Sequence, residues 1–321
     1  MHRAVSTIRV LRRATALRMP VQRVAAAPLT ASRSFSTIHV PVTSTPGRKA
    51  DFNAVESEIA GMQQKIREFY SKGDFVSGLE IAEICRDTVK VHFGEEHPVY
   101  ASTLNNMALM QKNLSLLEES IATYEHALRV YKACVGENHA SWATTLHNLG
   151  GVHRLHSHAL TGMKKIESLD LALECFEESL RVRRDILAAD HPDIAISMCN
   201  VGILYWHTHK KAKAEDMLVD AVERLEAKVG PSSPLTALAY NNLGIVYKEL
   251  GKFDPALDLF GRAADIRRAS LGELHVETIT TMHNLAETLR AAGRDDEATK
   301  IQEAILELVG DEEDNHPPEK Q

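Results

Sequence analysis

Histidine is the residue type whose spacing in this sequence comes closest to a metal site. Six histidines gather in two short stretches: His147, His153, His156, His158, His207 and His209. His153 and His156 lie three residues apart, so on a helix they would share a face and could bind zinc. A zinc site usually needs four ligands of fixed geometry, and no cysteine or close-spaced acid completes this set. We therefore expect no metal site.

Motifs for catalysis are missing from the sequence. It contains no phosphate-binding glycine loop, no HExxH helix and no GxSxG nucleophile motif. The four cysteines show neither CxxC nor CxxxC spacing: Cys85, Cys134, Cys175 and Cys199. Such isolated cysteines in helical patterns are typical of reduced, structural thiols. These observations predict a non-enzymatic protein that uses no cofactor.

Two recurring positions point to binding instead. The first is an asparagine that recurs at steps of 42, 52, 42 and 42 residues: Asn106, Asn148, Asn200, Asn242 and Asn284. Asparagine is unfavourable within a helix unless its amide, which both donates and accepts, finds a polar partner. The second position stands six residues further along: Lys112, Arg154, Trp206, Lys248 and Arg290. Four of these five are basic, which predicts a positive surface around one aromatic anchor. An ordinary solvated helix face is the alternative.

The elements that must position these residues follow the same frame. Apolar side chains recur with helical period over residues 240–247 and again over 256–263, so each unit is a pair of helices. Between the two helices, Gly251 is expected to end the first and Asp254 to cap the second, with Pro255 in the first turn.

Small residues occupy the positions where the helices must approach closely. The position two residues after each asparagine is Ala or Gly. The position 14 residues after it, or 24 residues in the unit that is ten residues longer, is Ala or Ser: Ser120, Ala172, Ala214, Ala256 and Ala298. Short side chains let each pair pack closely on the next. The frame also extends back to residues 72–75, which adds a degenerate first unit. We predict an all-α, right-handed solenoid of about six helix pairs over residues 51–310, with an acidic disordered tail at 311–321.

One step of the frame is ten residues longer than the others. The additional residues fall at about 157–166, in the loop inside the third unit. Loops of solenoids tolerate insertions, so neutral drift explains this one. Alternatively, Lys164 and Lys165 could provide a second contact surface.

This pattern resembles the tetratricopeptide repeat, in the 42-residue form of kinesin light chains. The likeness covers about residues 51–310 and is carried by residues 94–98, 104–108, 240–244 and 251–253. It implies a protein-binding scaffold in which the first helix of each pair lines a concave groove. In this family the recurring asparagine contacts the main chain of an extended peptide. Bridging between adjacent helices is the alternative role of the amides.

The start of the chain differs in charge from the remainder. No Asp or Glu precedes Asp51, and the first 35 residues contain seven arginines: Arg3, Arg9, Arg12, Arg13, Arg18, Arg23 and Arg33. Such a stretch is typical of a mitochondrial transit peptide, because a basic amphipathic helix is drawn to anionic membranes and along a negative-inside potential. A disordered basic tail is the alternative. The pattern around Arg33 and Ser36 resembles a matrix-protease cleavage site. We expect a transit peptide and linker over residues 1–50 and a location in the matrix or at the matrix face of the inner membrane.

Charge and hydropathy exclude other partner classes. Loss of the seven arginines would change the formal net charge from −7 to −14, which disfavours nucleic-acid binding. No run approaches 18 apolar residues, so no membrane span is expected.

The leading hypothesis is therefore a mitochondrial scaffold that binds an extended, acidic segment of a client protein. One alternative, by analogy with other imported repeat proteins, is an assembly or maintenance factor for a respiratory complex. A second is a cytosolic cargo adaptor like kinesin light chain, which requires that the basic start not act as a presequence. A third is an organellar RNA-binding repeat protein, although such proteins have basic grooves and units of about 35 residues.

The transit peptide is testable directly. Residues 1–50 fused to a fluorescent reporter should carry it into mitochondria, because they hold the seven arginines and no acid. Fluorescence microscopy and protease protection measure the location. A reporter that stays in the cytosol would contradict the assignment, and a fusion with the arginines replaced by glutamine serves as the control.

Overall fold

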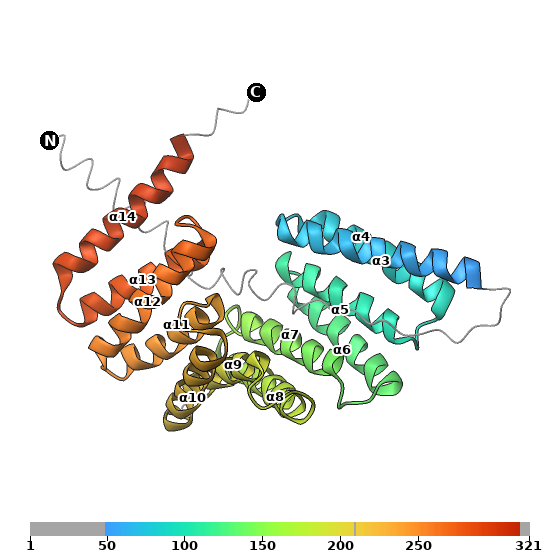
Figure 1. Ribbon diagram of the computed structural model, residues 1–321, viewed down its shortest axis with the longest axis horizontal. Coiled ribbons are helices and arrows are strands. Elements are labelled where there is room, and N and C mark those ends of the chain that lie inside the picture. The colour runs from blue at the N-terminus through green and yellow to red at the C-terminus, as the bar shows by residue number, and fades with distance from the viewer. Residues whose placement is uncertain (1–48, 209, 315–321) are drawn as a thin grey trace. The chain divides into compact units, whose positions relative to one another are not determined.

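A computed structural model describes residues 49–208 and 210–314 (Figure 1). The predicted transit peptide with its cleavage site, His209 and the last seven residues lie outside the described residues. The described residues form helices and no strand. The helices are α3 (Lys49–Ser71), α4 (Phe75–Phe93), α5 (Pro98–Asn113), α6 (Leu117–Cys134), α7 (Ala140–His156), α8 (Gly162–Ile186), α9 (Pro192–His207), α10 (Lys211–Val229), α11 (Pro234–Glu249), α12 (Phe253–Leu271), α13 (Val276–Ala291) and α14 (Asp295–Asp314).

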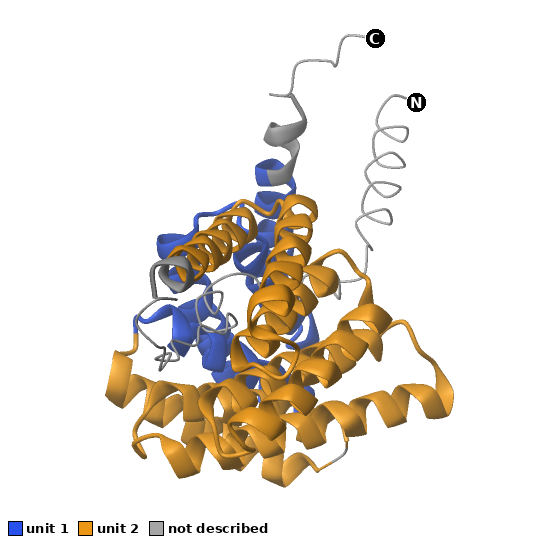
Figure 2. Ribbon diagram, turned by 90° about the vertical axis from the view of Figure 1, so that its right-hand side faces the viewer, with its two compact units in different colours: residues 1–27, 232–321 blue, residues 28–231 orange. Residues whose placement is uncertain are grey.

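These helices divide into two compact units, each of which is a stack of helix pairs (Figure 2). The N-terminal unit holds α3–α10 and the C-terminal unit holds α11–α14. Within each unit every helix packs against the next one in the chain, and successive first helices also touch, as α5 does α7 and α11 does α13. The predicted all-α helix-pair repeat is therefore confirmed. The degenerate first unit is a regular pair, α3 with α4.

Four of the first helices follow a turn that ends in histidine, with the sequence Gly-x-x-His at residues 94–97, 136–139 and 272–275 and Ala-x-x-His at residues 188–191. In the four first helices that follow such a turn, the histidine is the N-cap, and its Nδ1 accepts a hydrogen bond from the backbone N–H two residues on. The four N···N distances are 3.3 Å at His97, 3.1 Å at His139, 3.2 Å at His191 and 3.2 Å at His275. Ser233 caps α11 in the same way through its hydroxyl. Because Nδ1 accepts only when it carries no proton, these caps require neutral imidazole.

The turn inside each pair differs in detail from the sequence-based expectation. Gly251 does follow the end of α11, and its φ of 72° is in the left-handed region that glycine tolerates. The cap assigned to Asp254 was wrong. Helix α12 begins at Phe253, with Lys252 at the N-cap position, so Asp254 lies in its first turn, where its charge still complements the helix dipole.

Two boundaries also moved. Helix α8 begins at Gly162 and is 25 residues long, so half of the ten-residue insertion lengthens this helix and only the remainder is loop. Lys164 and Lys165 are exposed in its first turns. At the other end α14 continues to Asp314, past the expected limit at 310. The sequence has no proline between residues 295 and 316 that would end this helix earlier.

Small residues form the contact between the two helices of a pair, as predicted. The hydroxyl of Ser120 on α6 donates to the carbonyl of Ala108 on α5 at 2.8 Å. A Cβ added to Gly202 would lie 2.8 Å from Leu218 Cγ, and one added to Gly244 would lie 2.9 Å from Phe260 Cε1. Such distances leave no room for a side chain.

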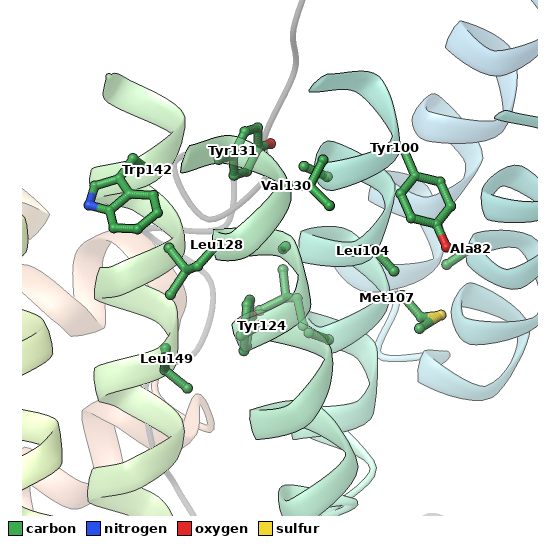
Figure 3. Packing of buried hydrophobic residues seen from close by; sticks show 14 of the residues in the cluster. Ala82, Tyr100, Leu104, Met107, Tyr124, Leu128, Val130, Tyr131, Trp142 and Leu149 are labelled. Atoms are coloured by element: carbon green, nitrogen blue, oxygen red, sulfur yellow. The ribbon is translucent and has the colours of Figure 1, made fainter. Parts of the chain in front are cut away.

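The apolar core of the N-terminal unit fills the space around these contacts (Figure 3). Tyr124 and Tyr131 of α6 are fully buried, and Leu128 of the same helix lies beside Trp142 and Leu149 of α7. Each large side chain buried in this way contributes about 1.5–3 kcal/mol. The core therefore runs from pair to pair, as expected of a repeat array.

We expect Gly244→Leu to destabilise the protein by about 1–3 kcal/mol, because a side chain would be forced into the fully buried ring of Phe260. Gly261→Ala on the neighbouring helix is the matched control. Its Cβ would meet nothing within 4 Å, so the helix should gain about 0.5–1 kcal/mol. Urea denaturation measures the free energy of unfolding of both variants. Equal stability of Gly244→Leu and the parent would show that Gly244 does not lie in the close contact between the helices.

Stability should also fall as the solution is acidified. Burial lowers the pKa of His97, lowers that of His153 to about 4, and lowers that of His147 well below 6.5. Because these folded-state values lie below the unfolded value of about 6.5, the unfolded chain binds more protons in this range. The histidine contribution is thus fully present above pH 6.5 and is lost as the pH falls towards 4. For His153 alone it reaches about 3 kcal/mol.

Urea unfolding at pH 7.5 and 5.5 measures this effect. The free energy of unfolding should be lower at the acidic pH, and His153→Gln should reduce the difference. A protein that is equally or more stable at pH 5.5 would contradict the assignment of these imidazoles as buried and neutral.

Candidate functional site

The described residues hold no arrangement suited to metal or thiol chemistry. Among residues 49–208 and 210–314, no group of three His, Cys, Asp or Glu side chains is placed to hold a metal ion. None of the four cysteines forms a disulfide, and burial raises the pKa of Cys85, Cys175 and Cys199 to about 12, which keeps these thiols protonated. In the same part of the chain no helix is long and apolar enough to cross a bilayer.

The recurring asparagines lie along the first helices of the pairs, and three of them bridge to the preceding first helix. Asn148 donates from Nδ2 to Asn105 Oδ1 at 3.3 Å, and Thr145 donates to the same oxygen at 3.2 Å. In the C-terminal unit Asn284 donates to Asn241 Oδ1 at 3.1 Å. The partner in each case directly precedes the asparagine of the previous repeat. These amides thus join neighbouring first helices, the structural role that the sequence left open.

The third bridge uses a histidine. Asn200 Nδ2 lies 3.4 Å from His147 Nε2, while Arg183 Nη1 lies 3.5 Å from Nδ1 of the same ring. Asn106 is fully buried and accepts from Asn105, whereas Asn242 is partly exposed. Peptide contact by the five asparagines remains a prediction, and the bridges show that their first role is to hold the strip of first helices together.

A group of cationic side chains lies beside these bridges. Lys112 of α5 and Arg154 of α7 are both partly buried and repel each other, and both act on the ring of His147. Burial, with Arg154 second, lowers the pKa of Lys112 to about 8. Burial also lowers the pKa of Arg154. Neither side chain forms an ion pair with an acid among the described residues. The structure thus brings together two of the predicted cations without a counter-charge there.

The positive charge of Arg154 also acts on the loop between α7 and α8, where half of the ten-residue insertion lies. His158 lies in the loop after α7, and its pKa is lowered by burial and then by Arg154, His207 and Lys165. Trp206, the predicted aromatic anchor on α9, is partly exposed, and Lys211 Nζ lies 5.0 Å from its ring centroid. We call the surface of Lys112, Asn148, Arg154, Asn200 and Trp206 the first-helix strip.

In the C-terminal unit the predicted cations Lys248 and Arg290 already have partners within the protein. Lys248 Nζ lies 3.1 Å from Glu287 Oε2 and 3.8 Å from Glu249 Oε1. A hydrogen bond from His283, and then those from Lys248, lower the pKa of Glu287 to about 2. Arg290 is exposed and donates to Gln302 of α14. Lys248 and Arg290 therefore do not offer the surplus charge that Lys112 and Arg154 do.

Two buried arginines were missed from the sequence. Arg183 of α8 donates to Ser197 Oγ at 2.6 Å, and Arg267 of α12 donates to the Glu277 carbonyl at 3.2 Å and to Thr281 Oγ1. Each clamps a second helix to the following first helix. The sequence did hold one sign of them: they lie 84 residues apart, which is two repeats. Other second helices carry the apolar or aromatic residues Tyr131 and Leu225 at the same position of the frame.

Solved structures share this fold at low sequence identity. A Podosopora anserina protein described as a kinesin light chain with nearly identical TPR-like repeats is 17% identical, with 68% of this chain and 99% of that chain covered and a TM-score of 0.54. BtubC (BKLC) from P. vanneervenii is 19% identical over 84% of this chain and 96% of that chain, with a TM-score of 0.55. The type IV pilus biogenesis factor PilW is 15% identical over 77% of this chain and 92% of that chain, with a TM-score of 0.53. Such identities establish the fold alone. Among curated proteins there is no significant match.

The family follows from the repeats themselves. The family model of the tetratricopeptide repeat matches residues 99–159, 165–227, 220–269 and 235–310, which together span more than half of the chain. The matches begin within α5 and reach into every later helix, so among the described helices α3 and α4 lie outside them. This chain belongs to the tetratricopeptide repeat family.

Proposed function

We propose that this protein is a non-enzymatic scaffold that acts in mitochondria and holds an extended, acidic segment of a client protein on its first-helix strip. The repeat architecture suits protein binding, because stacked pairs present a long, continuous surface. The observation that carries the choice of client is the pair Lys112 and Arg154, two partly buried cations without an acid among the described residues.

Electrostatics explains why this pair favours an acidic partner. Two like charges that repel each other and are poorly hydrated destabilise the free protein, and this is visible in the lowered pKa of Lys112. A client carboxylate close to both side chains would relieve this repulsion. An exposed ion pair contributes only about 0–1 kcal/mol, but a partly desolvated one contributes more.

The polar bridges fit the same proposal. Asn148 and Asn200 lie on the helices that carry Arg154 and Trp206, and their bonds to the preceding helix fix the spacing of the strip. A preformed surface binds with less loss of conformational entropy than a flexible one. Trp206 would supply the apolar anchor of the interface.

The location rests on the basic, acid-free start of the chain, and the reporter fusion described above tests it separately from client binding. A role in assembling a respiratory complex would be one instance of this scaffold function. No feature of the described residues favours it over another mitochondrial client.

We expect Lys112→Glu combined with Arg154→Glu to weaken binding of an acidic peptide by about tenfold or more, which corresponds to about 1.4 kcal/mol. The probe is a labelled decapeptide of alternating glutamate and alanine, measured by fluorescence anisotropy at two salt concentrations. Binding should weaken as salt rises, because the charges are screened.

The matched control is Lys213→Glu combined with Lys300→Glu, two exposed lysines on second helices that change the net charge equally. This control should bind the peptide almost as the parent does. Equal binding by the Lys112 and Arg154 variant, with unchanged circular dichroism, would refute the assignment. So would equal binding of a peptide that has lysine in place of glutamate.

A further inference from the structure

A cavity lies on a different side of α5 from the first-helix strip. This cavity of about 450 Å³ opens between α4, α5 and α6, a volume within the range of small-ligand and side-chain pockets. Its floor is Tyr100, Leu104 and Met107, three buried side chains of α5 at helical spacing. Figure 3 shows Tyr100 and Met107 directed to the same side, that of Ala82 on α4.

One residue that lines this cavity departs from the repeat. Arg86 of α4 stands in the frame at the position of four buried apolar residues in the later second helices: Leu128, Leu180, Val222 and Ala264. In α6 the equivalent Leu128 is buried, and Figure 3 shows it on the side of that helix toward Trp142 and Leu149 of α7. On α4 the equivalent residue is a polar arginine, and it lines the cavity.

The guanidinium of Arg86 lies over the apolar floor. Its Nη1 is 3.7 Å from Met107 Sδ, and its Nε donates to Asp87 Oδ1 at 2.8 Å. The side chain remains 29% exposed at the mouth of the cavity, so it can meet a ligand.

Further cations surround the mouth. Arg129 of α6 is exposed and has no ion pair with another described residue, and Lys90 pairs with Glu95. The acids that pair with Arg86 and Lys90 are themselves exposed, with about half or more of each side chain in water. Such pairs exchange readily for an incoming carboxylate. An apolar floor under arginine donors suits a bulky apolar group with a carboxylate next to it.

We propose that this cavity binds a partner segment in which a bulky apolar side chain, such as phenylalanine, is flanked by acidic residues. The apolar side chain would occupy the space above Leu104 and Met107, and the carboxylates would pair with Arg86 and Arg129. A peptide is favoured over a free metabolite because the cavity is open at the mouth, and the cations are spread over both second helices, α4 and α6.

This site is separate from the first-helix strip. Leu104 and Asn105 are consecutive, so their side chains leave α5 about 100° apart. Leu104 shares its stripe with Tyr100 and Met107, whereas Asn105 shares its stripe with Lys112. The inference therefore does not rest on the proposed function, and the protein would hold two partners, or two segments of one partner, on different faces of the same helix.

Methionine methyl NMR tests the proposal, because Met107 is in the floor of the cavity. The probe is a blocked peptide Glu-Glu-Phe-Glu-Glu added to the full-length protein with labelled methionine methyl groups, with Met107→Leu to assign the resonance. The Met107 signal should shift and saturate with peptide in the range up to about 1 mM. The shift should disappear when alanine replaces the phenylalanine or lysine replaces the glutamates.

Arg86→Leu is the decisive variant, because it installs the residue found at Leu128 and Leu180. It should fold with equal or higher melting temperature and lose the peptide-induced shift, while Lys112→Glu combined with Arg154→Glu should keep it. An unchanged shift in Arg86→Leu, or no shift in the parent, would overturn the proposal. A shift lost only in the Lys112 and Arg154 variant would place the peptide on the first-helix strip. Equal affinity for 3-phenylpropionate would overturn the assignment to a peptide.

Discussion

The rest of the structure depends on the close contact between the two helices of each pair. At that contact the side chains are Ala, Gly or Ser, and the neighbouring ring or leucine occupies the space that a Cβ would need, as at Gly202 and Gly244. Close approach lets each pair bury one apolar face internally and present the other to the next pair. Without it the first helices could not lie side by side, and the recurring polar residues on them would not meet.

The same periodicity creates an electrostatic problem. A repeat places equivalent residues of successive units next to each other, so a basic residue kept in frame lies beside another basic residue. In the C-terminal unit Glu287 pairs with Lys248 and so neutralises one of these charges. Glu287 stands in the frame where other first helices carry Ile245, Ile203 or Leu109. Between Lys112 and Arg154 no described acid plays that part. This repulsion is the reason why we propose an anionic partner.

Departures from the repeat carry the other functional information. The buried arginines Arg183 and Arg267 replace apolar residues and tie helices together through hydroxyl and carbonyl acceptors. Arg86 stands where later second helices carry an apolar residue, donates to Asp87 of its own helix and lines a cavity. A buried arginine on a second helix therefore joins that helix to the next first helix only where the first helix presents hydrogen-bond acceptors to it.

The sequence alone determined the helix pairs, the frame of their equivalent positions and the close contacts, because these depend on local periodicity and on small residues at fixed spacing. It also placed the recurring asparagines and cations on the first helices. It could not decide which charges are neutralised, since Lys248 and Glu287 are 39 residues apart and meet only when α11 packs on α13. It did not assign the N-caps to the histidines, because an imidazole is an uncommon cap and its role depends on backbone geometry. Only the tertiary structure showed that Lys112 shares the field of Arg154 and that Arg86 overhangs a cavity, because both depend on distances between helices that no spacing along the chain encodes.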